Sequence, residues 1–213
     1  MEDIAIFGAG GLGREVACLI NRINQDKQIY NFIGFFDDEK PKGEFVNYGK
    51  VLGGIDALNA WDKQLSIVVC IGSPNAIEMI VSKITNPNII FPNIIHPDFV
   101  INDPATFSIG YGNIIQSGCS VSCDVAIGNF NVLNGAVVFG HDDKVGNFNC
   151  FMPAIRVSGN VTIGNTNFFG VGSIILQKIK VGNNIRLGAG SVLMTKAKDG
   201  QLYIGNPAKK TVL

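Results

Sequence analysis

Histidine and tryptophan are scarce in this sequence of 213 residues, which contains two histidines and one tryptophan. Two imidazoles cannot supply a metal site that needs three histidine ligands. The five cysteines are odd in number and form no CxxC pair, which excludes a regular disulfide framework and indicates reduced, mostly buried thiols. Cys119 and Cys123, with so few histidines available, also make a poor zinc site. The sequence therefore predicts no metal.

An excess of charge of one sign is missing as well, because 17 basic residues balance 17 acidic ones and no Lys/Arg run occurs. This excludes the electrostatic pattern of a nucleic-acid or anionic-membrane binder and predicts a small-molecule or protein partner. The first residues, "MEDIAIFGAG", resemble neither a signal peptide nor a membrane span. We therefore expect no membrane span and a cytoplasmic protein.

The first half of the chain alternates between strand-like and helix-like segments. Val16, Leu19, Ile20 and Ile23 share one face of a helix over residues 14–23. Alternation of this kind predicts a small parallel sheet with helices on its faces, a Rossmann-like α/β domain. The expected strands are residues 3–7, 30–38, 65–72 and 88–95, and the other expected helices are 53–61 and 74–84.

A cluster of prolines separates the two halves. Pro87, Pro92, Pro97 and Pro104 are four of the eight prolines in the chain, and they disfavour a continuous helix there. We expect a first domain over residues 1–86, a junction over 87–108 and a second domain with a C-terminal cap over 109–213.

The second half repeats with a period of six residues. With 46% apolar residues overall, fifteen apolar residues at successive sixth positions would arise by chance about once in 10⁵ trials per register. The positions are Ile109, Ile115, Val121, Ile127, Leu133, Phe139, Val145, Phe151, Val157, Ile163, Phe169, Ile175, Val181, Leu187 and Leu193.

This period fits a solenoid of short parallel strands that bends after every sixth residue, with the apolar residue inside. With three hexads in each coil, residues 109–192 make between four and five coils without an insertion. Glycine and asparagine are expected to relieve the backbone of the turns. The repeat by itself predicts only a scaffold.

The hexads, "GAGSV" at 188–192 and "GNPAK" at 205–209 together resemble the left-handed β-helix acyltransferases. "IFGAGGLGRE" and "FFDD" are similar to the N-terminal domain of one branch, the sugar acetyltransferases related to bacterial sialic-acid O-acetyltransferases and to UDP-sugar N-acetyltransferases of bacillosamine synthesis. The resemblance implies a left-handed parallel β-helix, acetyl-CoA as co-substrate and a homotrimer with active sites between subunits. The γ-class carbonic anhydrases share the solenoid but require three imidazoles.

Gly8, Gly10 and Gly13 form a GxGxxG loop between a strand and a helix, where bare backbone can approach phosphates. Asp37 follows this loop at close to the spacing that a dinucleotide site requires, so NAD binding is one alternative. A tight turn without a ligand, followed by solvated acids, is another. The resemblance implies instead that the loops bind the acceptor substrate through Gly10, Gly11, Leu12, Asp37, Asp38, Gly72 and Ser73. Many relatives carry a histidine at the position of Leu12.

His141 stands in "GHDD" and aligns with the general base of the family motif. Acetyl transfer to an amine needs a proton acceptor, and an imidazole of pKa near 6.5 suits that role. Asp142 takes the acidic position that stabilises the imidazolium and raises its pKa. The alternative is a polar turn residue. His96, in "IIHPD", is interpreted as structural.

Cys150 departs from the family pattern, because relatives commonly place there a second histidine that hydrogen-bonds the thioester carbonyl. A thiol is a weak donor, so backbone N–H groups would have to polarise the thioester. Cys150 is interpreted as a buried small residue rather than an acylated intermediate. The other acetyl-CoA contacts implied by the resemblance are Gly159, Val171, Ala189 and Lys209, with a bare C-terminal cap as the alternative for Lys209.

Together these patterns predict an acetyl-CoA-dependent acyltransferase that acetylates the amino group of a nucleotide-linked amino sugar, such as a UDP-sugar, in surface polysaccharide biosynthesis. O-Acetylation of a sialic-acid-type sugar is one alternative, because a histidine base serves hydroxyls as well. A catalytically weakened nucleotide-sugar-binding protein is the other, because Leu12 and Cys150 replace expected histidines. The sugar, its nucleotide and the length of the acyl group are left open.

Overall fold

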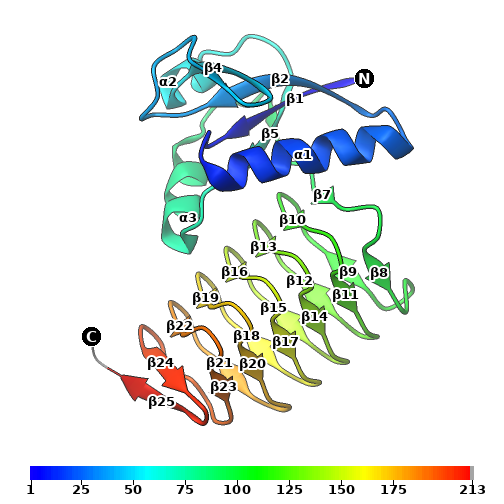
Figure 1. The fold of residues 1–213 in the computed structure, drawn as a ribbon, viewed down its shortest axis with the longest axis vertical. Helices are drawn as coiled ribbons and strands as arrows, with labels where there is room; N and C mark the ends of the chain where they lie inside the picture. Colours follow the sequence, from blue (N-terminus) through cyan, green and yellow to red (C-terminus); the bar gives the residue numbers. More distant parts are fainter. Residues whose placement is uncertain (212–213) are drawn as a thin grey trace. The chain divides into compact units, whose positions relative to one another are not determined.

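The computed structural model describes residues 1–211, and the chain forms two compact units that meet between Pro97 and Asp98 (Figure 1). The first unit is an α/β domain, and the second is a parallel β-solenoid. Both agree with the fold class expected from the sequence.

The sheet of the first unit runs in the order β3-β4-β2-β1-β5-β6. All neighbours pair in parallel except β3 and β4, which form an antiparallel hairpin at one edge. All residues of β5 are buried, as expected for a central parallel strand covered on both faces. The strands are β1 (Glu2–Phe7), β2 (Tyr30–Phe36), β3 (Phe45–Val46), β4 (Gly49–Gly53), β5 (Leu65–Val69) and β6 (Ile89–Ile90).

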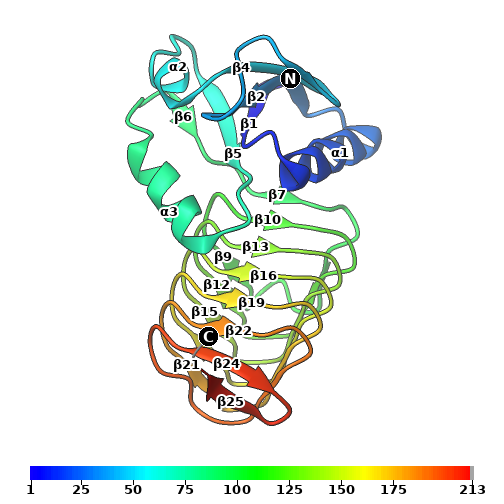
Figure 2. The same ribbon diagram turned by 60° about the vertical axis from the view of Figure 1, so that its left-hand side comes forward.

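Three helices cover this sheet: α1 (Gly11–Asp26) lies on one face, and α2 (Ile55–Asn59) and α3 (Pro74–Lys83) lie on the other (Figure 2). The predicted apolar face of α1 is confirmed, because Val16, Leu19, Ile20 and Ile23 are all buried. Burying an aliphatic side chain contributes about 1.5–3 kcal/mol, so this stripe fixes the helix to the sheet.

One sequence prediction for the first unit is wrong, and one element was not predicted. Residues 88–95 do not form one strand: β6 is followed by a separate strand β7 (Ile94–Ile95), with Pro92, which has no N–H for a strand ladder, between them. The hairpin of β3 and β4 was not predicted, because its segment is rich in glycine and has no clear two-residue alternation.

The second unit consists of two-residue strands in three parallel sheets. Paired residues stand three hexads apart in the sequence, as Ile115 and Leu133 do, which confirms the predicted coil length. The first solenoid sheet contains β10 (Ile114–Ile115), β13 (Val132–Leu133), β16 (Cys150–Phe151), β19 (Phe168–Phe169) and β22 (Arg186–Leu187). The second contains β8 (Val100–Ile101), β11 (Ser120–Val121), β14 (Val138–Phe139), β17 (Arg156–Val157), β20 (Ile174–Ile175) and β23 (Val192–Leu193). The third contains β9 (Ser108–Ile109), β12 (Ala126–Ile127), β15 (Lys144–Val145), β18 (Thr162–Ile163) and β21 (Lys180–Val181).

The solenoid extends upstream of the hexads that begin at Ile109. Ile101 of β8 pairs with Val121, and these two residues stand farther apart in the sequence than Val121 and its other partner, Phe139. A short insertion between β8 and β9 places Ile101 outside the hexad register, which is why the sequence pattern does not include this strand.

The fifteen hexad residues form the core of the solenoid, and all except the half-buried Ile109 are buried. Phe139, Phe151 and Phe169 pack together along the axis, with ring centroids 5.1 and 4.7 Å apart. Aromatic packing of this kind adds about 0.5–1.5 kcal/mol per pair beyond area burial.

The expectation that glycine and asparagine relieve the turn backbone is confirmed at some positions, such as Gly118, Gly172 and Asn160, which have positive φ angles, but not at the glycines that directly follow the hexad residues. Positive φ angles fall on residues such as Asp124, Asp142 and Asn160, which occupy equivalent places in successive coils, and not on the glycines after the hexads. The glycines after the hexads instead allow successive coils to pack closely. At Gly146, for example, an added Cβ would lie 2.6 Å from the Gly164 carbonyl oxygen.

The chain closes with a hairpin of β24 (Leu202–Gly205) and β25 (Ala208–Thr211), in which β24 pairs with β22 and extends the first solenoid sheet. Within residues 1–211, no helix combines the length and the apolar character that crossing a membrane requires.

Candidate functional site

The first unit has a cavity of about 540 Å³ at the carboxyl ends of its strands, where the strand order reverses between β1 and β5. Open parallel sheets bind ligands at this point. The sequence-predicted residues Gly10, Gly11, Leu12, Asp37, Asp38 and Gly72 all line the cavity; Ser73, next to Gly72, does not.

The glycines of the loop have two separate roles. A side chain on Gly8 or Gly13 would overlap the protein backbone: Gly8 meets the Cys70 carbonyl, and Gly13 meets the Gly8 carbonyl. At Gly10 and Gly11, by contrast, an added Cβ would have no atom within 4 Å. Internal packing therefore explains two of the four glycines, and the other two present bare backbone to the cavity.

The start of α1 provides an electropositive wall. Gly10 is the N-cap, no side chain caps the helix, and its first turn contains no acidic residue. Backbone N–H groups at a helix N-terminus favour an anion. Together with the cavity, this arrangement suits a phosphate group.

Asp37 and Asp38 hold the loops around the cavity. The Oδ2 atom of Asp37 accepts a hydrogen bond from the Ala9 N–H at 2.7 Å, and its Oδ1 accepts from the Glu39 and Lys40 N–H groups. Asp38 accepts from the Ile55 N–H at 2.7 Å, at the start of α2. Each carboxylate therefore has a structural role and keeps further lone pairs for a ligand.

Several apolar lining residues were not found by sequence reasoning. Met79 and Ile80 come from α3, and Ile71 follows β5. The sequence offered no signal for them, because apolar residues on a helix that covers a sheet are normally core residues; in the structure Met79 is 48% exposed. With Leu12, these residues give the cavity an apolar part of its lining in addition to the acidic residues.

A second group of predicted residues lies on the solenoid, at the turn between β14 and β15. The Nδ1 atom of His141 lies 2.7 Å from Oδ2 of Asp142, and 61% of the imidazole side chain is exposed. Because a carboxylate only accepts, this contact favours the tautomer with the proton on Nδ1 and leaves Nε2 as a free base.

Gly159 supports this imidazole from the equivalent turn of the next coil. A Cβ on Gly159 would overlap Nε2, Cε1 and Cδ2 of His141, so the ring lies directly against the glycine backbone. The Asn160 N–H donates to the His141 carbonyl at 2.7 Å. Beside them, Asp142, Lys144 and Asn160 line a polar hollow of about 420 Å³.

Asp143 belongs to the same turn and was missed by sequence reasoning. It is fully buried, and its Oδ1 accepts from the Val161 N–H at 2.8 Å. Burial raises the pKa of its carboxyl to about 7, although the Val161 and Gly140 N–H groups and His141 act in the opposite direction. The sequence did contain a signal for this residue: the repeat places Asp143 at a position that is apolar in the preceding and following coils, where it is Val125 and Val161.

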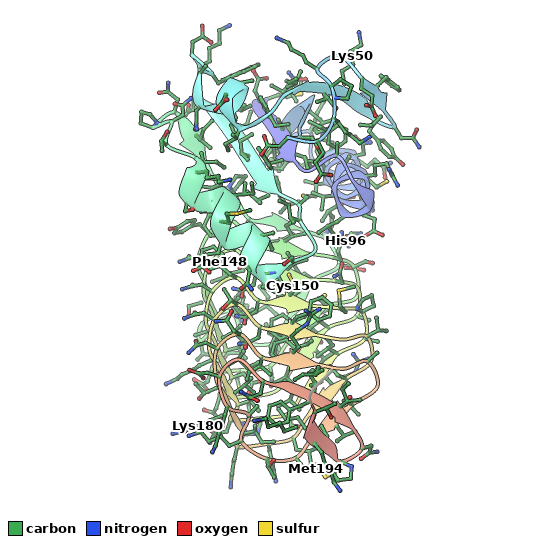
Figure 3. The ribbon with its side chains drawn as sticks, turned by 90° about the vertical axis from the view of Figure 1, so that its left-hand side faces the viewer. Lys50, His96, Phe148, Cys150, Lys180 and Met194 are labelled. Carbon is green, nitrogen blue, oxygen red and sulfur yellow. The ribbon has the colours of Figure 1, made fainter. Side chains whose placement is uncertain are left out.

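Cys150, on β16, is buried, and burial raises the pKa of its thiol to about 12 (Figure 3). It is therefore a neutral thiol and a weak hydrogen-bond donor near neutral pH.

The remaining predicted acetyl-CoA contacts lie elsewhere on the solenoid. Val171 and Ala189 occupy successive coils of the corner between the first and second solenoid sheets, joined by the Gly190 N–H donating to the Val171 carbonyl. His141 and Gly159 occupy the corner between the second and third sheets. Lys209 lies on β25 and is exposed. The structure thus brings His141, Asp142 and Gly159 together, and Val171 and Ala189 together at a different corner.

Across residues 1–211, no cluster of three or more His, Cys, Asp or Glu side chains has an arrangement that could hold a metal ion.

Residues 3–84 match the family model of the PglD N-terminal domain. The acetyltransferase domain of PglB from Neisseria gonorrhoeae, solved with acetyl coenzyme A, is 28% identical, with a TM-score of 0.86 and coverage of 99% of both chains. PerB from Caulobacter crescentus, solved with CoA and GDP-perosamine, is 26% identical, with a TM-score of 0.89 and coverage of 100% of this chain and 98% of that one. WeeI from Acinetobacter baumannii shares the fold at 23% identity, TM-score 0.86 and coverage of 99% and 100%. No curated protein matches the chain.

The hexad core, the left-handed β-helix and the full-length similarity define a hexapeptide-repeat acyltransferase. Within that class, the chain combines a segment that matches the PglD N-terminal domain with full-length similarity to the acetyltransferase domain of PglB and to PerB.

Proposed function

We propose that this protein transfers an acetyl group from acetyl-CoA to the amino group of a nucleotide-linked amino sugar, with His141 as general base. The observation that carries the proposal is the exposed imidazole held by Asp142 at Nδ1 and by Gly159 beneath the ring. Relatives solved with acetyl coenzyme A, and with CoA and GDP-perosamine, support the substrate classes.

The chemistry follows from the free Nε2 atom. The sugar amine attacks the thioester carbonyl, the new C–N bond forms, and Nε2 accepts the proton that the nitrogen loses. Asp142 stabilises the resulting imidazolium through the 2.7 Å contact at Nδ1. The C–S bond then breaks, and the thiolate of CoA leaves and takes up the proton held at Nε2, which restores the free base. A positioned base contributes about 10² to 10⁴ in rate.

The cavity of the first unit is proposed to hold the nucleotide part of the acceptor. The bare Gly10 and Gly11 backbone and the uncapped start of α1 suit a diphosphate. Asp37 and Asp38 are placed to accept hydrogen bonds from ribose or sugar hydroxyls, and Leu12 supplies an apolar contact. Gly72 would line the far wall, with Ser73 next to it outside the cavity lining.

For acetyl-CoA, the proposed contacts are backbone groups of Gly159, Val171 and Ala189 along the pantetheine arm, with Lys209 near its nucleotide end. Cys150 contributes little polarisation to the thioester, because its buried neutral thiol is only a weak hydrogen-bond donor. We therefore expect backbone N–H groups to stabilise the oxyanion.

A homotrimer is proposed from the outward face of the second solenoid sheet. Phe139 and Ile175 point inward, so their neighbours Val138 and Ile174 point outward, where they are only partly buried, as is Val192. The corners that carry His141 and Val171 flank this sheet, so packing between copies would assemble both halves of an acetyl-CoA site. The five cysteines form no disulfide, which suits the proposed cytoplasmic location.

The test is release of CoA from acetyl-CoA with UDP-, dTDP- and GDP-linked amino sugars, together with free sugars that offer only hydroxyls. We expect turnover with an amino sugar and its loss in His141→Ala. Turnover only of hydroxyl acceptors would favour O-acetylation. Binding of a nucleotide sugar without turnover would favour a weakened binding protein, the alternative motivated by Leu12 and Cys150.

A further inference from the structure

Asp143 is an unusual residue for its position in the fold. It lies at a turn whose equivalent residues in other coils are Val125, Val161, Ile179 and Ala197, all buried and apolar. A carboxyl group placed in an apolar column costs free energy unless its hydrogen bonds are satisfied.

Those hydrogen bonds are only partly satisfied. Oδ1 accepts from the Val161 N–H at 2.8 Å, but Oδ2 is buried and finds no hydrogen-bond partner among residues 1–211. The Gly140 N–H lies near enough to favour the anion, yet it donates to the Val157 carbonyl at 2.9 Å. Stability alone therefore does not explain this acid.

Another corner of the solenoid contains a column of stacked asparagine side chains, which have a purely structural role. Asn113, Asn131, Asn149 and Asn167 stack on successive coils, and each of the last three donates to the side-chain oxygen of its equivalent in the coil before it. Asp143 belongs to no such series. Its single occurrence coincides with the coil that carries His141.

Asp143 is connected to the His141 imidazole through the segment 159–161 of the next coil. The segment 141–143 holds the segment 159–161 at two points: the His141 carbonyl accepts from the Asn160 N–H, and the Asp143 carboxyl accepts from the Val161 N–H. Next to these two contacts lies Gly159, whose backbone supports the His141 ring. Asp143 thus fixes the surface on which the imidazole rests.

We propose that Asp143 is a positioning residue for His141, which holds the turn of residues 159–161 against the imidazole through its hydrogen bond to the Val161 N–H. The role assigned to His141 rests on the proposed function; the positioning of its ring does not. A side chain that cannot accept this hydrogen bond will leave the fold intact and let the imidazole move.

Two variants separate the hydrogen bond from the charge. Asp143→Val copies the apolar neighbours and removes both, whereas Asp143→Asn removes the charge and keeps an acceptor oxygen. We expect Asp143→Val to melt at or above the temperature of the unmodified protein, with kcat lower by about tenfold and KM unchanged. Asp143→Asn should keep kcat within about threefold. As a control, Asn167→Val removes the acceptor of the Ile185 N–H, and should lower the melting temperature without changing kcat.

A readout without turnover comes from NMR of ¹³C-labelled histidine, because the chain has only two histidines and His141→Ala assigns the signals. The His141 signal should shift or broaden in Asp143→Val and stay close to its original position in Asp143→Asn. If no acceptor is turned over even by the unmodified protein, the proposed function fails and this spectrum still decides the positioning role. A folded Asp143→Val with unchanged kcat and His141 signal, or equal effects of Val and Asn, would overturn the inference.

Discussion

At the scale of single residues, the proposed chemistry depends on the turn 141–143 and on Gly159 in the next coil. His141 and Asp142 could be predicted as the base and its partner from the sequence because their motif is local, and these roles stay a prediction. Asp143 and the support from Gly159 depend on the stacking of successive coils, and this became evident only when the contacts between coils were known.

The Gly159 contact predicts a sharp effect of one methyl group. Gly159→Ala should lower kcat by about tenfold or more, because the added Cβ displaces the imidazole while the backbone conformation remains accessible to alanine. Gly135→Ala is the matched control, since its Cβ meets only the Ser117 carbonyl at an ordinary 3.5 Å. Steady-state kinetics of both variants test this, and equal kcat values would contradict it.

The raised pKa of Asp143 predicts how stability depends on pH. The folded carboxyl keeps its proton up to about pH 7, while the unfolded one loses it near its ordinary pKa of 3.8. The folded state therefore binds more protons between these values, and this group makes stability fall as pH rises through that window, by about 1.4 kcal/mol per pKa unit. A charged His141 opposes the pKa shift and a charged Asp142 adds to it.

Asp143→Asn removes this contribution, so the two proteins should differ in their pH dependence of unfolding. Urea unfolding at pH 5 and pH 8 is the measurement. The unmodified protein should lose more stability than Asp143→Asn between the two values; equal losses would contradict the assignment.

At the scale of elements, the loop between β1 and α1 contains glycines with two different expected roles. Gly13 is required for packing within the protein, and Gly10 is proposed to contact the nucleotide sugar. Gly13→Ala should destabilise the first unit by about 2 kcal/mol or more, because its Cβ would overlap the Gly8 carbonyl. Gly10→Ala should leave stability nearly unchanged and weaken binding of the nucleotide sugar. Thermal melts and calorimetric titration distinguish the two outcomes; a Gly13→Ala protein as stable as the original would refute this account of the loop.

The elements also show what sequence patterns resolve. Period six located all the solenoid strands from β9 to β23, and the amphipathic stripe located α1, because in both a strong apolar repeat coincides with burial. The β3–β4 hairpin, the break at Pro92 and strand β8 were missed. Each is very short or lies outside the repeat register, so pairing with distant segments decides it.

At the scale of the whole molecule, the proposed trimer depends on the outward face of the second solenoid sheet. Ile174→Glu should dissociate the assembly and abolish activity, because it places a charge in an apolar contact. Lys180→Glu on the third sheet, where Lys180 is exposed and points away from the solenoid (Figure 3), should change neither. Light scattering coupled to size exclusion tests this, and a monomeric but active protein would refute the proposed shared site.

The central claim is that His141 accepts the proton of an amine during acetyl transfer. The most direct measurement is CoA release from acetyl-CoA with nucleotide-linked amino sugars, for the unmodified protein and for His141→Ala, with binding of the acceptor checked in both. The account predicts turnover that falls by about 10² to 10⁴ in the variant while acceptor binding is retained. Equal turnover in both proteins would contradict it.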